Sequence, residues 1–141
     1  MSAPSLRDLA AHWLATALGD LATAEAVLGD PLLPPREAAV FAEQAAEKAI
    51  KGALVFTGRD PPRTHDLSEL ARLAPADWRV RLLDLELAPL AGALRPARYP
   101  EYFDAPVTLD EAARLVSDAR AVVAAVLADL GDHGLEQPPA A

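Results

Sequence analysis

Cysteine is absent from the 141 residues, and aromatic residues make up only 5% of them. Without cysteine the chain forms neither disulfides nor thiolate metal sites. The runs of β-branched and aromatic residues that are typical of strands are also missing. Hydrophobic residues still amount to 52%, so Ala, Leu and Val must form the core. Because small side chains let helices approach closely, this composition favours a helical protein.

Long apolar stretches and a targeting pattern are missing as well. The longest apolar runs are far shorter than the roughly 18 residues that suggest a membrane span. The N-terminal segment leads directly into an amphipathic pattern, without the basic stretch and apolar core of a signal peptide. We therefore expect a cytoplasmic protein that does not engage a membrane.

A basic surface is not supported by the net charge, which is −8. This argues against a dedicated nonspecific nucleic-acid binder. The charge is uneven, however: residues 36–98 contain ten Lys/Arg and nine Asp/Glu, a net of +1, and the rest of the chain has a net of −9. An anionic ligand is therefore expected to approach the middle of the sequence.

The apolar residues that are present recur with the spacing of amphipathic helices. The predicted helices cover about residues 5–28, 35–57, 67–73, 77–94 and 108–131. Leu6 and Leu9 belong to the apolar face predicted for the first helix. Gly58 is expected to end the second helix in a left-handed conformation. Pro89 should kink the fourth helix. These elements predict an all-α fold, an up-and-down bundle of four long helices plus a short fifth helix.

One domain is expected over residues 1–131, followed by a flexible polar tail over residues 132–141. The helices carry more apolar surface than the contacts between them within one bundle require. The apolar surface left over is sufficient for a homodimer interface.

Two patterns of common catalytic sites are absent. The chain has no Glu-x-x-His pair of a carboxylate-bridged metal site and no glycine-rich phosphate loop, so we expect neither a metal ion nor another cofactor.

Of the three histidines, His12 is expected to be structural and His133 to lie in the tail without a role. His65 stands at a helix entrance beside Arg59 and Arg63. It either caps or packs at that helix, or acts as a general acid or base or as a phosphate contact.

Two further groups combine cations with polar neighbours. Lys48 and Lys51 form either a solvated face of the second helix or part of an electropositive groove. Glu47 precedes Lys51 by four residues, the order that favours a helical ion pair. Arg98 and Tyr99 stand between two prolines, where Arg98 either grips a phosphate in a bidentate way or pairs with a carboxylate of the second helix.

Four segments together resemble the HEPN domain family, which is named for nucleotide binding in higher eukaryotes and prokaryotes. They are Phe41 to Lys51, Pro61 to Leu67, Ala97 to Pro100 and Thr108 to Ala112, within about residues 5–131. The resemblance implies an all-α bundle, commonly a homodimer, often encoded beside a minimal nucleotidyltransferase with which it forms a toxin–antitoxin pair. It also implies a relation to metal-independent ribonucleases, whose signature is an Arg, four to six residues and then a His before the last long helix. In some pairs the partner adenylates a Tyr beside that motif.

The ribonuclease signature is incomplete in this chain. No histidine follows Arg98 within reach, and Arg59 and His65, which have the right separation, lie in a different loop. Either Arg98 and His65 converge into a rebuilt catalytic site, or the chain binds without cutting. In the first case His65 activates the ribose 2′-hydroxyl and Arg98 stabilises the phosphorane.

Three functional hypotheses follow. The leading one is a HEPN-like module that interacts with a nucleotide or RNA and acts with a nucleotidyltransferase partner. The residues predicted to bind the nucleotide are Lys48, Lys51, Arg63, Tyr99 and Glu47. The second is an active metal-independent ribonuclease toxin that uses Arg98 and His65. The third is a structural helical dimer without a ligand.

Overall fold

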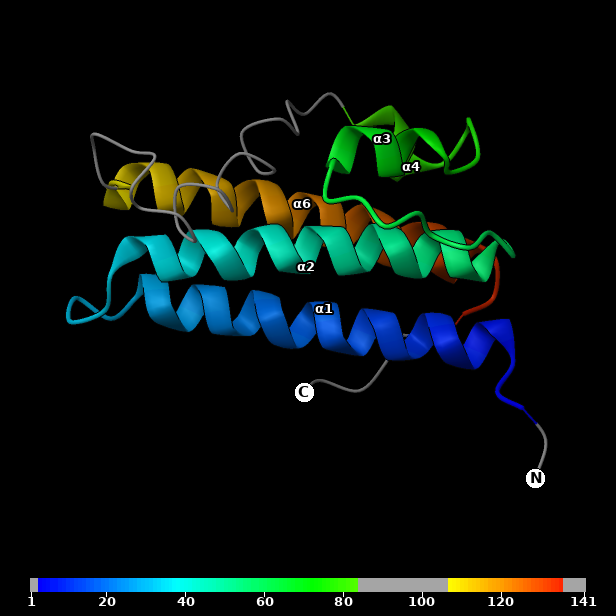
Figure 1. The fold of residues 1–141 in the computed structure, drawn as a ribbon, viewed down its shortest axis with the longest axis horizontal. Coiled ribbons are helices and arrows are strands. Elements are labelled where there is room, and N and C mark those ends of the chain that lie inside the picture. The colour runs from blue at the N-terminus through cyan, green and yellow to red at the C-terminus, as the bar shows by residue number, and fades with distance from the viewer. Residues whose placement is uncertain (1–2, 84–106, 136–141) are drawn as a thin grey trace.

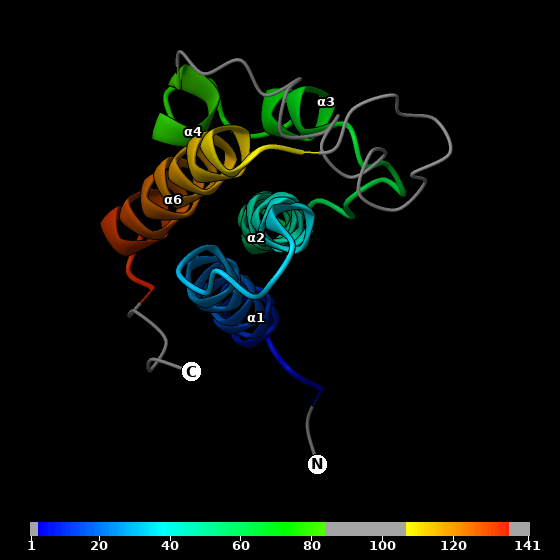
Figure 2. The ribbon, with the colours of Figure 1, turned by 90° about the vertical axis from the view of Figure 1, so that its left-hand side faces the viewer.

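The computed structural model describes residues 3–83 and 107–135, in which every regular element is a helix. The helices are α1 (Leu6–Leu28), α2 (Pro35–Phe56), α3 (Leu67–Arg72), α4 (Arg79–Leu82) and α6 (Leu109–Asp132). The three long helices, α1, α2 and α6, run side by side along the molecule (Figure 1). Figure 2 shows the short helices α3 and α4 over α2 and α6, on the side away from α1. The predicted all-α bundle is confirmed.

Three of the four predicted long helices have bounds within one residue of the prediction. α6 continues one residue past Gly131 and ends at Asp132. The helix predicted over residues 77–94 is not continuous: α4 has Trp78 as its N-cap and ends at Leu82, because Leu83 has a non-helical ψ of 123°. Its remainder, including the predicted kink at Pro89, lies outside the described residues.

Short polar motifs set the ends of these helices. Ser5 and Asp8 form a reciprocal capping box at the start of α1, which satisfies backbone N–H groups that have no partner within the helix. Thr108 accepts a hydrogen bond from the backbone N–H of Glu111 at the start of α6. After α2, Gly58 has φ +85°, the left-handed conformation predicted for it.

The core is built mainly from alanine on α1 and α2, so the two helices lie close together. Gly52 of α2 lies directly against α1, because a Cβ atom there would lie 2.9 Å from the Cβ of Trp13. The periodicity places Leu6 and Leu9 in the buried stripe of α1, but both are exposed, and burial begins at Ala10. No helix within the described ranges combines the length and apolar character that crossing a membrane requires.

A single buried carboxylate joins α4 to α6. Asp129 accepts hydrogen bonds from the backbone N–H groups of Arg79 at 2.8 Å and Val80 at 3.0 Å. It therefore caps α4 from another helix. Nearby, the ring of His133 lies 5.1 Å from that of Trp78, so His133 packs on the bundle, although the sequence suggested no role for it.

Candidate functional site

Glu47 contacts both Lys51 and His65, which the sequence placed in different segments. Its Oε1 lies 2.6 Å from Nδ1 of His65, and its Oε2 accepts a hydrogen bond from Nζ of Lys51 at 3.1 Å. The predicted ion pair between Glu47 and Lys51 is therefore confirmed. The pairing with His65 joins the middle of α2 to the loop before α3.

The loop around His65 is held by hydrogen bonds on both sides of the histidine. Thr64 accepts a bond from the backbone N–H of Asp66 at 3.1 Å and donates to Glu69 at 3.4 Å. Asp66 in turn accepts from the backbone N–H of Glu69 at 3.1 Å and is the N-cap of α3. The capping role considered for His65 thus belongs to Asp66, and the imidazole is left to contact Glu47.

The three side chains differ sharply in their access to solvent. His65 is 68% exposed, whereas the side chains of Glu47 and Lys51 are 13% and 14% exposed. A carboxylate hydrogen-bonded to Nδ1 fixes the orientation of an imidazole ring. Since Nε2 of His65 has no hydrogen-bond partner among the described residues, it is the atom that can exchange a proton with a ligand.

The charge on Glu47 is stabilised despite its position. Burial by itself raises the pKa of this carboxyl, but hydrogen bonds from His65 and Lys51, together with their positive charges, outweigh that effect. The pKa of Glu47 therefore lies below its ordinary value of 4.5. Glu47 stays ionised across the neutral range and can keep His65 in place.

This lowered pKa predicts a pH-dependent contribution to stability. A carboxyl with a lower pKa in the folded state stabilises the protein above its unfolded-state pKa, and the contribution is lost as the pH falls through the folded-state value. Glu47→Gln should therefore lower the free energy of unfolding by about 1–2 kcal/mol at neutral pH and by much less near pH 3. Thermal unfolding of both proteins at about pH 7, 5, 4 and 3 measures the difference.

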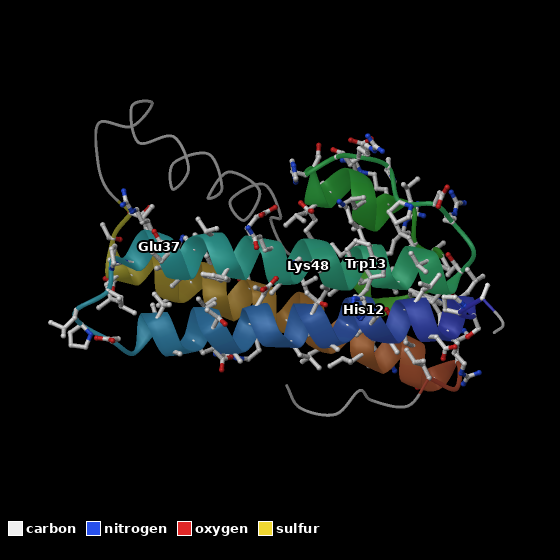
Figure 3. The ribbon with its side chains drawn as sticks, turned by 60° about the horizontal axis from the view of Figure 1, so that its bottom comes forward. His12, Trp13, Glu37 and Lys48 are labelled. Atoms are coloured by element: carbon white, nitrogen blue, oxygen red, sulfur yellow. The ribbon has the colours of Figure 1, made fainter. Side chains whose placement is uncertain are left out.

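The control for removing one negative charge from α2 is Glu37→Gln, at the exposed start of the same helix. Figure 3 shows Glu37 far along α2 from the end on which α3 and α4 lie. A stability difference between wild type and Glu47→Gln that stays constant from neutral pH to pH 3 would contradict the stabilising role given to the ionised form of Glu47.

The same region contains the residues that could hold a metal ion. Glu43, Glu47 and His65 each place one ligand atom within 4.8 Å of the others, and Glu43 is fully buried. Oε1 of Glu47 contacts His65 and Oε2 accepts from Lys51, so a metal ion held by Glu47 and His65 would replace the direct contact between these two side chains. The expectation of a metal-free site remains a prediction, which chelation with EDTA tests.

The remaining predicted site residues lie elsewhere or outside the described residues. Nζ of Lys48 lies 2.6 Å from Oδ2 of Asp20, so its ammonium is directed toward α1 and not toward Glu47 (Figure 3). Arg63 is exposed in the loop two residues before His65 and forms no ion pair with any described residue. Arg98 and Tyr99 fall outside the described residues, so their predicted roles rest on the sequence.

Two carboxylates of the described residues are buried, Glu43 and Asp129; the sequence suggested Glu43 only as one possible partner of Arg98 and suggested no role for Asp129. Glu43 lies one helical turn before Glu47, and Asp129 lies three residues after Val126, in the apolar stripe of α6. A charged residue at a stripe position was the available signal, because such a group is rarely buried without a specific partner. For Asp129 those partners are the backbone N–H groups of α4.

Comparison with known proteins places this bundle in a family. The sequence profile of the HEPN domain matches residues 10–130. The protein TT1696 from Thermus thermophilus, whose crystal structure is known, shares 29% sequence identity with this chain. The two structures superimpose with a TM-score of 0.71, over 83% of this chain and 94% of TT1696. No match is found among curated protein sequences. Because the profile spans most of the chain and the architecture agrees, the protein belongs to the HEPN domain family.

Proposed function

We propose that this chain is a HEPN module that binds a nucleotide or a short RNA at His65 and acts with a minimal nucleotidyltransferase in a toxin–antitoxin-type pair. The observation that carries the binding proposal is the 2.6 Å contact between His65 and Glu47, made by an imidazole that is otherwise open to solvent. The nucleotidyltransferase partner is proposed from membership of the family.

Each residue of the site has a distinct part in this proposal. His65 contacts the ligand, donating a hydrogen bond from Nε2 to a phosphate oxygen or a ribose hydroxyl. Glu47 orients the imidazole, and Lys51 keeps Glu47 ionised. Arg63, exposed in the same loop, supplies a second positive charge for a phosphate.

Catalysis is the alternative within the same site. An imidazole oriented by a carboxylate is the usual arrangement of a general base, which a metal-free ribonuclease needs to activate the 2′-hydroxyl. The cation that would stabilise the phosphorane is Arg98, proposed from the sequence alone.

The experiment that tests the proposal measures binding and cleavage in parallel. Binding of ATP and of a short fluorescent single-stranded RNA would be titrated with EDTA present. We expect binding by the wild type and a loss of at least about tenfold in affinity for His65→Ala, because a hydrogen bond to a charged group is removed. His12→Ala, which removes an exposed histidine from α1, is the matched control and should bind as the wild type does.

Cleavage of the same RNA decides between binding and catalysis. If the wild type cuts RNA without metal, and both His65→Ala and Arg98→Ala abolish cutting, the ribonuclease alternative is correct. If the wild type binds neither nucleotide nor RNA, the proposed function is wrong and the structural dimer is left.

A further inference from the structure

A pocket outside the His65 site lies where the end of α2 meets α3 and α4. It has a volume of about 280 Å³. The segment after α2 contributes Thr57 and Arg59, and the segment from the end of α3 to α4 contributes Arg72, Pro75 and Arg81 among others. None of His65, Glu47 and Lys51 lines it.

Three of the eight residues that line this pocket are arginines, and none is acidic. Within the described part of the chain, Arg59, Arg72 and Arg81 form no ion pair, whereas Arg79 and Arg120 do. The three arginines thus line one pocket of a protein whose net charge is −8. Arginines that line one pocket and pair with no carboxylate of the described residues are the arrangement expected for a site that takes an anion from solution.

Hydrogen bonds hold the chain on both sides of the pocket. Gly58 turns the chain after α2, and the backbone N–H of Arg59 donates to the carbonyl of Leu54 at 3.0 Å. On the opposite wall, Nη1 of Arg81 donates to the carbonyl oxygen of Ala74 at 2.9 Å, which holds one guanidinium group at the pocket. The segment after α2 and the segment from the end of α3 to α4 thus bring the three arginines to one pocket.

We infer that this arginine pocket binds a phosphate-containing anion, either inorganic pyrophosphate or the phosphate chain of a nucleotide. Guanidinium groups present pairs of N–H donors that match the oxygens of a phosphate. The volume suits a di- or triphosphate group and is smaller than most sites that enclose a complete drug-sized ligand. The inference does not depend on the proposed function, because the two sites share no residue.

Isothermal titration with sodium pyrophosphate, at constant ionic strength and with EDTA present, tests the inference. We expect saturable binding by the wild type, and a loss of at least about tenfold in affinity for Arg59→Ala and for Arg72→Ala. Both side chains are exposed, so neither substitution should disturb folding, which circular dichroism verifies. Arg36→Ala, an exposed arginine at the start of α2, is the matched control.

Two additional titrations distinguish a nucleotide from free pyrophosphate and distinguish this pocket from the His65 site. If ATP binds with the same dependence on Arg72 and more tightly than pyrophosphate, the pocket takes a nucleotide; equal affinities mean that the phosphates alone are recognised. His65→Ala should leave pyrophosphate binding unchanged, even if it abolishes the binding proposed for the His65 site. Absence of saturable binding, or an equal loss in Arg36→Ala and Arg72→Ala, would overturn the inference.

Discussion

Asp129→Ala is expected to lower the free energy of unfolding by about 3 kcal/mol, with a fall of about 10 °C in Tm. The buried carboxylate accepts from two backbone N–H groups at the start of α4, and Val80, which carries one of them, is itself buried. Alanine leaves both donors without a partner in a region that water reaches poorly. The cost exceeds that of an ordinary helix cap because two hydrogen bonds to a charged group are lost together.

Two variants separate this effect from a general loss of charge. Asp132, the second partner of Arg79, has a side chain that is 60% exposed. Asp132→Ala removes only this exposed partner and should change the free energy of unfolding by less than about 1 kcal/mol. Asp129→Asn keeps one acceptor oxygen and should lie between the two alanine variants. Chemical denaturation of all four proteins measures the series, and equal losses for the two alanine variants would contradict the capping role of Asp129.

Gly52→Ala and Gly131→Ala are expected to change stability in opposite directions, although both replace a glycine within a helix. At Gly52 a Cβ atom would lie 2.9 Å from Cβ of Trp13 and 3.5 Å from the carbonyl oxygen of Ala10. Neither atom belongs to the flexible end of a side chain, so α1 and α2 must move apart. We expect a net loss of about 1–2 kcal/mol, since overpacking outweighs the gain in helix propensity.

Gly131 is the matched control because, apart from its own chain neighbours and the backbone of its own helix, no described atom lies within 4 Å of the Cβ position there. Alanine at this site restricts the unfolded chain and favours the helix, so a gain of about 0.5 kcal/mol is expected. Gly52→Leu should be more destabilising than Gly52→Ala, because its side chain would enter the space that Trp13 and Leu14 already fill. The urea midpoint of each variant reports the change, and a stabilising Gly52→Ala would show that the two helices are less closely packed than the distances indicate.

The candidate site was partly predictable, and the reason differs from residue to residue. The Glu47–Lys51 pair follows from a spacing of four residues within one helix, which places both side chains on one face. The contact between Glu47 and His65 spans 18 positions and depends on the path of the intervening loop. For Lys48 the sequence was compatible with two alternatives, a solvated helix face or part of an electropositive groove. Its ion-pair partner, Asp20, lies on a different helix.

The sequence by itself determined the three long helices, their ends and the family. Local periodicity, capping residues and proline positions fix these features within a few neighbouring residues, so no distant contact is needed to read them. The tertiary structure decided which carboxylate holds His65, how Asp129 caps α4 and how three arginines meet at one pocket. Each of these contacts joins residues that are far apart in the chain, and small differences in how helices pack determine whether such side chains reach one another.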